Sequence, residues 1–201
     1  MESTHRAYSD QVSLEKKTAL VRANPKVTVP DPNNFRIIAP AGHWASGVRI
    51  VSPFSLKTTS YHPLGENEAA VSIALVKFDR FKEDSFVLVG SVKDFVMVPK
   101  SYSECYVRTF IFDKEGKSMD FLYNTTMDGM PLSIHPHKGM ILAGIGSKLR
   151  LYDVGKKQLL KKCEYKHSYT GINNICTMGE RIFVSDVSDS FHLLKHKSRE
   201  N

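Results

Sequence analysis

The chain has 201 residues, of which 41% are apolar and 24% are charged, and its formal net charge at pH 7 is +7. This is the composition of a globular protein and argues against global disorder, while the positive charge permits a polyanionic partner without requiring one. The apolar runs fall far short of the ~20 residues that cross a bilayer, and the N-terminus lacks the apolar core of a signal peptide, so we expect a cytosolic or nuclear protein.

Residues 1–40 differ from the rest of the chain. They are polar and contain four prolines, Pro25, Pro30, Pro32 and Pro40. Each proline removes a backbone donor and biases the preceding residue toward extended conformations, and the apolar residues between positions 10 and 22 are too poorly spaced for a clear helical stripe. We predict a linker or extended arm for residues 1–40 and a separate domain for residues 41–201.

From Trp44 onward the chain consists of short apolar or alternating runs separated by Gly, Pro, Asp and Lys-rich turns. These runs have the length and the β-branched or aromatic enrichment of strands, and no segment shows helical periodicity over ten or more residues. The predicted strands are 48–52, 69–78, 86–92, 106–112, 119–126, 140–146, 148–154, 158–165, 172–178, 181–187 and 191–196. The predicted fold class is all-β.

A repeated unit is visible within these strands. The runs 86–92, 140–146 and 181–187 each place four buried-strand residues before a small or acidic residue, at Gly90, Gly144 and Asp186, and these positions are 54 and 42 residues apart. Propeller blades of four strands have repeats of about 40–50 residues, whereas a β-sandwich or barrel would show no such unit. We predict a partial β-propeller of about three to four blades, and therefore a piece of a larger protein.

Several of these segments resemble one family of propeller proteins. The resemblance covers the runs 43–53, 66–78, 87–101, 149–167 and 181–197. It points to the family that contains the large polyadenylation specificity subunit, the large damaged-DNA-binding subunit and a splicing subunit. Asn-Glu-Ala at 67–69 and Leu-Arg-Leu-Tyr at 149–152 are similar to features of the whole family. Trp-Ala-Ser at 44–46, the run 153–167 and Val-Ser-Asp-Val at 184–187 resemble the splicing branch.

The resemblance implies part of the C-terminal propeller of a nuclear, non-catalytic scaffold of pre-mRNA splicing. Its expected partners are the HEAT-repeat subunit and the small subunits of the splicing factor 3b complex, which acts in the U2 small nuclear ribonucleoprotein during branch-site recognition. Nucleic acid would be contacted indirectly, through that complex, and the resemblance implies no catalytic residue, cofactor, membrane or small-molecule substrate. The alternative is a nucleic-acid-binding propeller module of a sister branch, in RNA 3′-end processing or damaged-DNA recognition.

Five lysines form the candidate interaction surface: Lys156, Lys157, Lys161, Lys162 and Lys166. The segment 153–157 has the composition of a hairpin turn between two strands. If Leu159 and Lys161 share one face of the second strand, then Leu160, Lys162 and Glu164 share the other, so the lysines do not all point one way. We predict that these lysines are exposed to solvent and bind nothing. The alternatives are that they form the rim of a protein interface or that they contact RNA directly.

Trp44, the only tryptophan, completes the candidate set. We predict that its ring packs in the core at the start of the β region, with its indole nitrogen bonded to an acceptor; the alternative is an interface anchor.

Other motifs do not support a chemical site. The run GIGSK at 144–148 lacks the spacing of a phosphate loop and precedes a strand, so no nucleotide is expected. His135 and His137 flank Pro136 without a nearby third ligand, so we predict a pair of turn histidines and no metal site. The cysteines, Cys105, Cys163 and Cys176, are too far apart for a metal motif and odd in number, so we predict reduced, buried thiols.

Overall fold

The computed structural model describes residues 39–166, 170–188 and 190–197. Within these ranges every regular element is a strand except one short 3-10 helix, η1 at Asp79–Phe81, so the predicted all-β fold is confirmed. No helix of the described chain has the length and apolarity to span a membrane. The arm predicted for residues 1–40 lies almost entirely outside the described residues.

The strands form four antiparallel sheets. The first is a hairpin, β1 (Gly47–Val51) and β2 (Thr58–Pro63). The second contains β3 (Glu68–Val76), β4 (Phe86–Lys93), β5 (Glu104–Phe112) and β6 (Met119–Met127). The third contains β7 (Pro131–His137), β8 (Met140–Ile145), β9 (Lys148–Asp153) and β10 (Leu160–Lys166). The fourth contains β11 (Ile172–Met178), β12 (Arg181–Asp186) and β13 (Phe191–Lys195).

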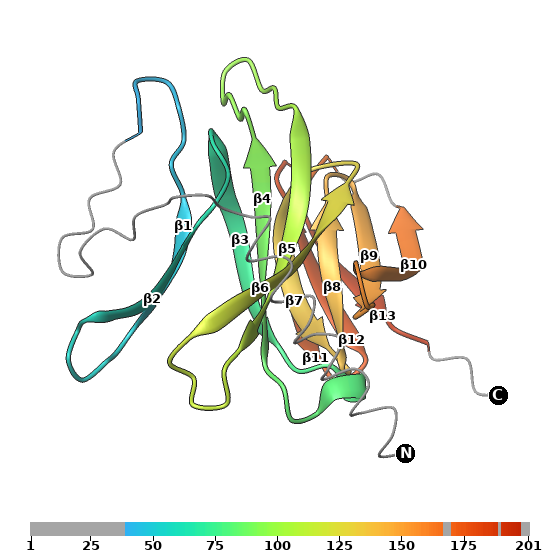
Figure 1. Ribbon diagram of the computed structural model, residues 1–201. Helices are drawn as coiled ribbons and strands as arrows, with labels where there is room; N and C mark the ends of the chain where they lie inside the picture. The colour runs from blue at the N-terminus through green and yellow to red at the C-terminus, as the bar shows by residue number, and fades with distance from the viewer. Residues whose placement is uncertain (1–38, 167–169, 189, 198–201) are drawn as a thin grey trace.

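The sheets follow one another as a fan, with the β1–β2 hairpin at one side and β10 and β13 at the other (Figure 1). In each of the last three sheets the strands lie side by side in chain order. The first strands of these sheets are neighbours: β7 contacts both β3 and β11. This is the arrangement of successive propeller blades, so the prediction of a partial β-propeller is confirmed. We call these three sheets the first, second and third blades.

The hydrophobic core lies between the blades rather than within them. A large cluster joins the first and second blades and includes Leu88, Val107, Ile141 and Tyr152. A smaller cluster joins the second and third blades through residues such as Leu142, Leu151, Ile172 and Val184. The β1–β2 hairpin covers the opposite face of the first blade through Val48, which packs with Val87, Val89, Phe110 and Met119.

The second strand of each blade carries the predicted repeat, with one correction. Gly90 pairs with Ser72, Gly144 with Ser133 and Ser185 with Asn174, each directly beside a register shift in the first strand. Ser185 is therefore the equivalent of the two glycines, and the assignment to Asp186 was wrong by one position. Asp186 instead accepts hydrogen bonds from the backbone N–H groups of Thr170, Gly171 and Ser188.

These glycines are required by the neighbouring blade. A Cβ atom at Gly90 would lie 2.6 Å from the carbonyl oxygen of Pro131, and one at Gly144 would lie 2.5 Å from Cγ2 of Ile172. Both contacts are too short for any side chain without movement of the next blade's first strand.

Two strands were not predicted. The sequence of β2 is mostly polar, and β7 contains Pro131 and Pro136, which normally argue against a strand. β7 is the terminal strand of its sheet, so one of its two edges pairs with no other strand. A proline whose nitrogen faces that edge removes no hydrogen bond of the sheet and therefore costs little stability. His135 and His137 consequently lie in a strand, and the prediction that they occupy a turn was wrong; Lys138 and Gly139 form that turn.

The prediction for the cysteines was correct only for Cys105, which is buried and has its pKa raised by burial to about 11. Cys163 and Cys176 are exposed. Cys163 lies on β10, the terminal strand of the second blade, and Cys176 faces outward on β11. Neither thiol is therefore buried, although cysteines usually are.

Candidate interaction surface

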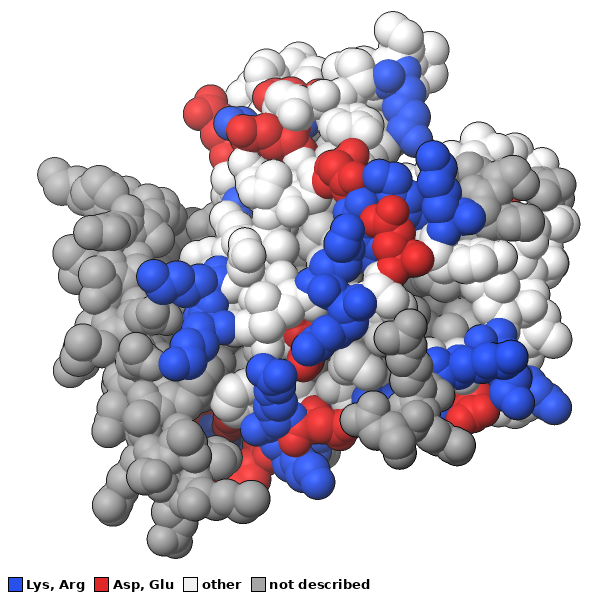
Figure 2. All heavy atoms as spheres, turned by 90° about the vertical axis from the view of Figure 1, so that its right-hand side faces the viewer, with Lys and Arg blue, Asp and Glu red and all other residues white. Residues whose placement is uncertain are grey.

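The five candidate lysines lie on the hairpin that ends the second blade. β10 is the outermost strand of this blade, and all seven of its residues are exposed. Figure 2 shows the side of the molecule where this strand lies, with Lys and Arg side chains in a diagonal band interrupted by acidic groups. An exposed strand edge rich in lysine resists unwanted pairing with other strands, and it can also meet an acidic partner.

The connection between β9 and β10 is held against the first blade. Val154 and Leu159 are buried at its two ends, and the backbone N–H of Leu159 donates to Thr125 Oγ1 at 2.9 Å. Gly155 allows the chain to turn here, because a Cβ atom would lie 2.2 Å from the carbonyl oxygen of Gln158. Lys156 and Lys157 are exposed at this connection, as the hairpin prediction requires.

A β-bulge in β10 changes the faces predicted for its lysines. Lys161 pairs with Tyr152 while Cys163 pairs with Leu151, so Lys162 is the extra residue. After the bulge, Glu164 pairs with Arg150 and therefore shares a face with Lys161, not with Lys162 as simple alternation predicts. The Nζ atom of Lys162 lies 3.5 Å from Asp153 Oδ2.

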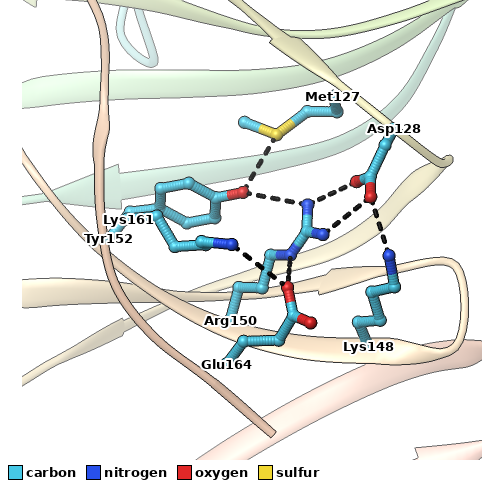
Figure 3. A network of polar contacts seen from close by, with 7 residues as sticks. All are labelled: Met127, Asp128, Lys148, Arg150, Tyr152, Lys161 and Glu164. Atoms are coloured by element: carbon cyan, nitrogen blue, oxygen red, sulfur yellow. Dashed lines mark hydrogen bonds and ion pairs between the residues drawn. The ribbon is translucent and has the colours of Figure 1, made fainter. Parts of the chain in front are cut away.

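Arg150 is the centre of a polar network that sequence reasoning did not find (Figure 3). Its Nε donates to Glu164 Oε2 at 2.7 Å, and its Nη2 donates to Asp128 Oδ2 at 2.7 Å. The other guanidinium nitrogen, Nη1, bonds to Asp128 Oδ1 and to the hydroxyl of Tyr152. Lys148 adds a 2.7 Å contact to Asp128, and Lys161 a 3.4 Å contact to Glu164.

Electrostatics keep this network ionised at neutral pH. The hydrogen bonds from Arg150 hold the pKa of Asp128 far below its usual range and also lower the pKa of Glu164. The same bond to Asp128 raises the pKa of the Arg150 guanidinium. Three cations thus share two carboxylates, so the network itself is positive by one charge. The sequence did offer one indication of this network. The motif Leu-Arg-Leu-Tyr places a charged residue, Arg150, within a buried strand, and a buried charge needs partners.

The structure divides the candidate lysines into two groups. Lys161 and Lys162 form ion pairs within their own blade. Over the described residues, Lys156, Lys157 and Lys166 have no carboxylate within ion-pair distance, which leaves their charges available to a partner. The arrangement can attract acidic side chains or phosphates.

Trp44 does not join this surface. It precedes β1 in the chain, and β1 lies at the side of the fan opposite β10 (Figure 1). Its ring is half-buried, stacks on Phe95 with the centroids 5.9 Å apart, and donates from Nε1 to the Phe95 carbonyl at 2.6 Å. The indole nitrogen has the expected acceptor, but Trp44 belongs to none of the core clusters of the described residues, so its predicted place in the core was wrong.

The Asn-Glu-Ala motif also has a structural role. Glu68 is almost fully buried, and its Oε1 accepts from Arg108 Nε at 2.7 Å while Oε2 accepts from the Gly65 N–H at 2.7 Å. Burial alone would raise the pKa of Glu68, but the bonds from Arg108 and its other donors lower it overall. The ion pair ties β3 to β5 within the first blade.

His137 contacts a histidine of the segment that follows β13. His137 Nε2 lies 3.0 Å from His196 Nδ1, and residues 39–166, 170–188 and 190–197 contain no group of three or more metal-ligating side chains. Burial lowers the pKa of His137, and electrostatic interaction with the neighbouring His196, Lys138 and His135 lowers it further.

Fold and surface together define a partial β-propeller whose exposed outer strand is basic. Residues 45–201 match the family described as the CPSF A subunit region, and the chain belongs to this family.

Comparison with individual proteins adds detail. The chain is 39% identical over 163 residues to the Danio rerio protein named splicing factor 3B subunit 3, an alignment that covers 81% of this chain and 13% of that protein. It is also 39% identical over 175 residues to pre-mRNA-splicing factor rse1 of Emericella nidulans, covering 87% of this chain and 14% of the relative. Spliceosome-associated protein 130 A of Arabidopsis thaliana is 39% identical over 159 residues, which is 79% of this chain and 13% of that protein. The chain thus spans about one seventh of these relatives or less.

Proposed function

We propose that this chain acts in pre-mRNA splicing as a non-catalytic scaffold of the splicing factor 3b complex in the U2 small nuclear ribonucleoprotein. It would act in the nucleus, through protein–protein contacts during branch-site recognition. Its partners would be the HEAT-repeat subunit and the small subunits, and RNA would be reached through them. Residues 41–201 would be the domain responsible, a part of a C-terminal propeller, with residues 1–40 as a linker or extended arm.

One observation carries this proposal. The chain is 39% identical over 159–175 residues to proteins of Danio rerio, Emericella nidulans and Arabidopsis thaliana, and all three have splicing or spliceosome names. The exposed side of the second blade supports a binding role, because it presents the cations of Lys156, Lys157 and Lys166 to solvent. Broad propeller surfaces also suit protein contacts, since their strands are held rigidly by the inter-blade core.

Co-purification from nuclear extract tests the proposal. The full chain, tagged, would be recovered at about 0.1 M and about 0.5 M NaCl, where exposed charge pairs are screened to different extents. We expect the HEAT-repeat splicing subunit to be identified by mass spectrometry at both concentrations, because a broad, partly apolar contact resists salt. Recovery of chaperones alone would reject the scaffold role.

A second candidate function rests on the three lysines without carboxylate partners, Lys156, Lys157 and Lys166. Such cations can contact phosphates, as in the nucleic-acid-binding module of a sister branch. Binding to nucleic acid would then fall steeply with added salt as counterions are released. A triple Lys→Gln variant would lose RNA affinity if this function operates, and it would retain the HEAT-repeat subunit if the scaffold function operates.

A further inference from the structure

The outer edge of β10 is the free edge of a complete sheet. The second blade has all four strands of a propeller blade, in the order β10-β9-β8-β7, and β10 is its outer strand. Residues 167–171, which connect β10 to β11, are too few for a further strand of this blade. Among the described residues no strand pairs with the outer side of β10. A fifth strand would therefore have to come from outside the blade.

The backbone groups that point to this open side follow from the hairpin between β8 and β9. A two-residue turn joins these strands, so Lys148, which closes the hairpin, directs its N–H and C=O groups toward β8. By strand alternation, Leu149 directs its groups toward β10, where its partner is Tyr165. Glu164 and Lys166 lie on either side of Tyr165, so their N–H and C=O groups point to the open side.

One face of β10 lies toward the first blade. The side chains on this face are those of Lys161, Glu164 and Lys166, because their partners on β9 include Tyr152, which packs in the core between the first and second blades. All three are exposed. Since the first blade also has its four strands, no further strand of that blade is needed to explain the space in front of this face.

This face has an excess of positive charge. The network around Arg150 is positive by one charge, and Lys166 adds another without a carboxylate of its own among the described residues. Lys166 also lies directly opposite Lys148 in the strand register. Two like charges at opposite positions repel each other, and Lys148 shares its carboxylate, Asp128, with Arg150. An acidic side chain beside Lys166 would relieve this repulsion.

A peptide strand fits this edge better than a chain of phosphates does. The open N–H and C=O groups match the donors and acceptors of another peptide strand, which a nucleic acid does not offer in that pattern. The carboxylate of Glu164 lies between Lys161 and Lys166 and would repel a run of phosphates. Lysines at an edge disfavour indiscriminate pairing, so an acidic strand is the one that gains from them.

We propose that the outer edge of β10 binds an extended acidic segment of a partner protein as a fifth strand of the second blade. Main-chain hydrogen bonds to Glu164 and Lys166 hold the segment, and Asp or Glu residues on its face toward the first blade meet Lys161 and Lys166. This is β-strand addition, in which the backbone supplies affinity and alternate side chains supply specificity. The inference rests on the binding role proposed above, and it does not depend on a role in splicing.

Selection from a phage-displayed library of random peptides, with the full chain as bait, tests this proposal. We expect the enriched peptides to contain Asp or Glu at alternating positions without a proline between them. A synthetic copy of the most enriched peptide, labelled with fluorescein, would then be titrated with wild-type and variant chains by fluorescence anisotropy.

The decisive variants are Lys166→Pro and Lys166→Ala. Both remove the charge, but only proline also removes the N–H that points to the open edge. The hydrogen bonds between β9 and β10 remain, so the melting temperature should not change. We expect Lys166→Ala to weaken peptide binding about threefold, and Lys166→Pro at least about tenfold, because a backbone donor is lost as well.

A charge exchange gives a second test that does not depend on the folding of Lys166→Pro. Lys166→Glu should weaken binding of the acidic peptide several-fold. A copy of the peptide with Lys in place of its acidic residues should bind this variant more tightly than it binds the wild-type chain.

Hydrogen exchange measured by NMR locates the bound peptide. We expect the amides of Glu164 and Lys166 to exchange rapidly in the free chain and to be protected in the complex. The amide of Tyr165, which faces β9, should be protected in both states and is the internal control.

Four results would overturn the proposal. The first is a library that yields no acidic peptide while a single-stranded RNA oligonucleotide binds, which would make phosphate the ligand. The second is a peptide that binds Lys166→Pro and Lys166→Ala equally well. The third is a dimer in light scattering that Lys166→Pro dissociates, which would make a second copy the occupant. The fourth is slow exchange at Glu164 and Lys166 in the free chain, which would mean that the chain covers its own edge.

These results can be told apart from a failure of the scaffold role. Any of them together with recovery of the HEAT-repeat subunit from nuclear extract would reject the added strand alone. Recovery of chaperones alone, together with a peptide that behaves as expected, would reject the scaffold role and leave the added strand in place.

Discussion

Arg150 connects three parts of the molecule through one guanidinium group. It lies on β9, and its partners are Glu164 on β10 and Asp128, which follows β6. Its side chain is 8% exposed, whereas that of Asp128 is 50% exposed. Removing the arginine would leave two carboxylates without their main donor, although water can still reach one of them.

We expect Arg150→Ala to reduce the free energy of unfolding by about 2 kcal/mol, less than the ~3–5 kcal/mol lost when a fully buried pair is broken. Lys161→Ala is the matched control, since it removes only a surface pair to the same Glu164, and it should cost no more than about 0.5 kcal/mol. Urea denaturation measures both. Equal effects of the two variants would show that the network does not stabilise the junction.

His137 makes stability depend on pH. Its folded pKa is lowered, so the folded state favours the neutral ring and the unfolded state binds more protons. This contribution to stability is therefore present above the unfolded pKa of about 6.5 and is lost as the pH falls through the folded value. We expect the melting temperature to decrease between about pH 7.5 and about pH 5.5, and to decrease less in His137→Gln. The same slope in both proteins would contradict the assignment to His137.

At the scale of elements, the contact between blades depends on the glycine of each second strand. Gly144→Ala should lower stability by about 1–3 kcal/mol, because the new Cβ overlaps Ile172 on the first strand of the third blade. Ser185→Thr alters the equivalent position of the third blade, which no described blade covers, and should change stability by less than about 0.5 kcal/mol. Chemical denaturation of both variants separates the two effects. A harmless Gly144→Ala would mean that the blades are not packed as closely as the structure shows.

The elements also show what a single sequence can reveal. Alternation and β-branched residues were enough to predict most strands and the blade repeat. The strand β7 escaped prediction because Pro131 and Pro136 are tolerated only through its terminal place in the sheet, which is a tertiary fact. The faces of Lys161 and Glu164 were mispredicted because a bulge, invisible in the sequence, shifts the alternation by one residue.

The candidate surface was predicted only in part for the same reason. The lysines were recognisable as a group, yet the bulge at Lys162 and the pairing of β9 with β10 decide which of them meet a carboxylate. The network at Arg150 was missed because Asp128 lies 22 residues away in the sequence. Packing therefore decides which charges are free. For Trp44 the sequence predicted the acceptor of the indole nitrogen but not the place of the ring, which stacks on Phe95 outside the core clusters.

At the scale of the whole molecule, the described blades form a fan whose core lies at the blade contacts. The outer strand of the second blade, β10, is exposed and can carry binding residues, and one fold can serve several functions. The function of this chain therefore depends on its surface residues. The names of its relatives favour a function in splicing.

The most direct test of this account is whether the chain associates with the U2 small nuclear ribonucleoprotein. The tagged full chain would be recovered from nuclear extract, and the small nuclear RNAs bound to it would be measured by reverse transcription and quantitative amplification. We predict enrichment of U2 RNA over U1 RNA, and loss of this enrichment when the HEAT-repeat subunit is depleted from the extract. Absence of U2 enrichment, or enrichment of RNA 3′-end processing substrates in its place, would contradict the proposed role in splicing.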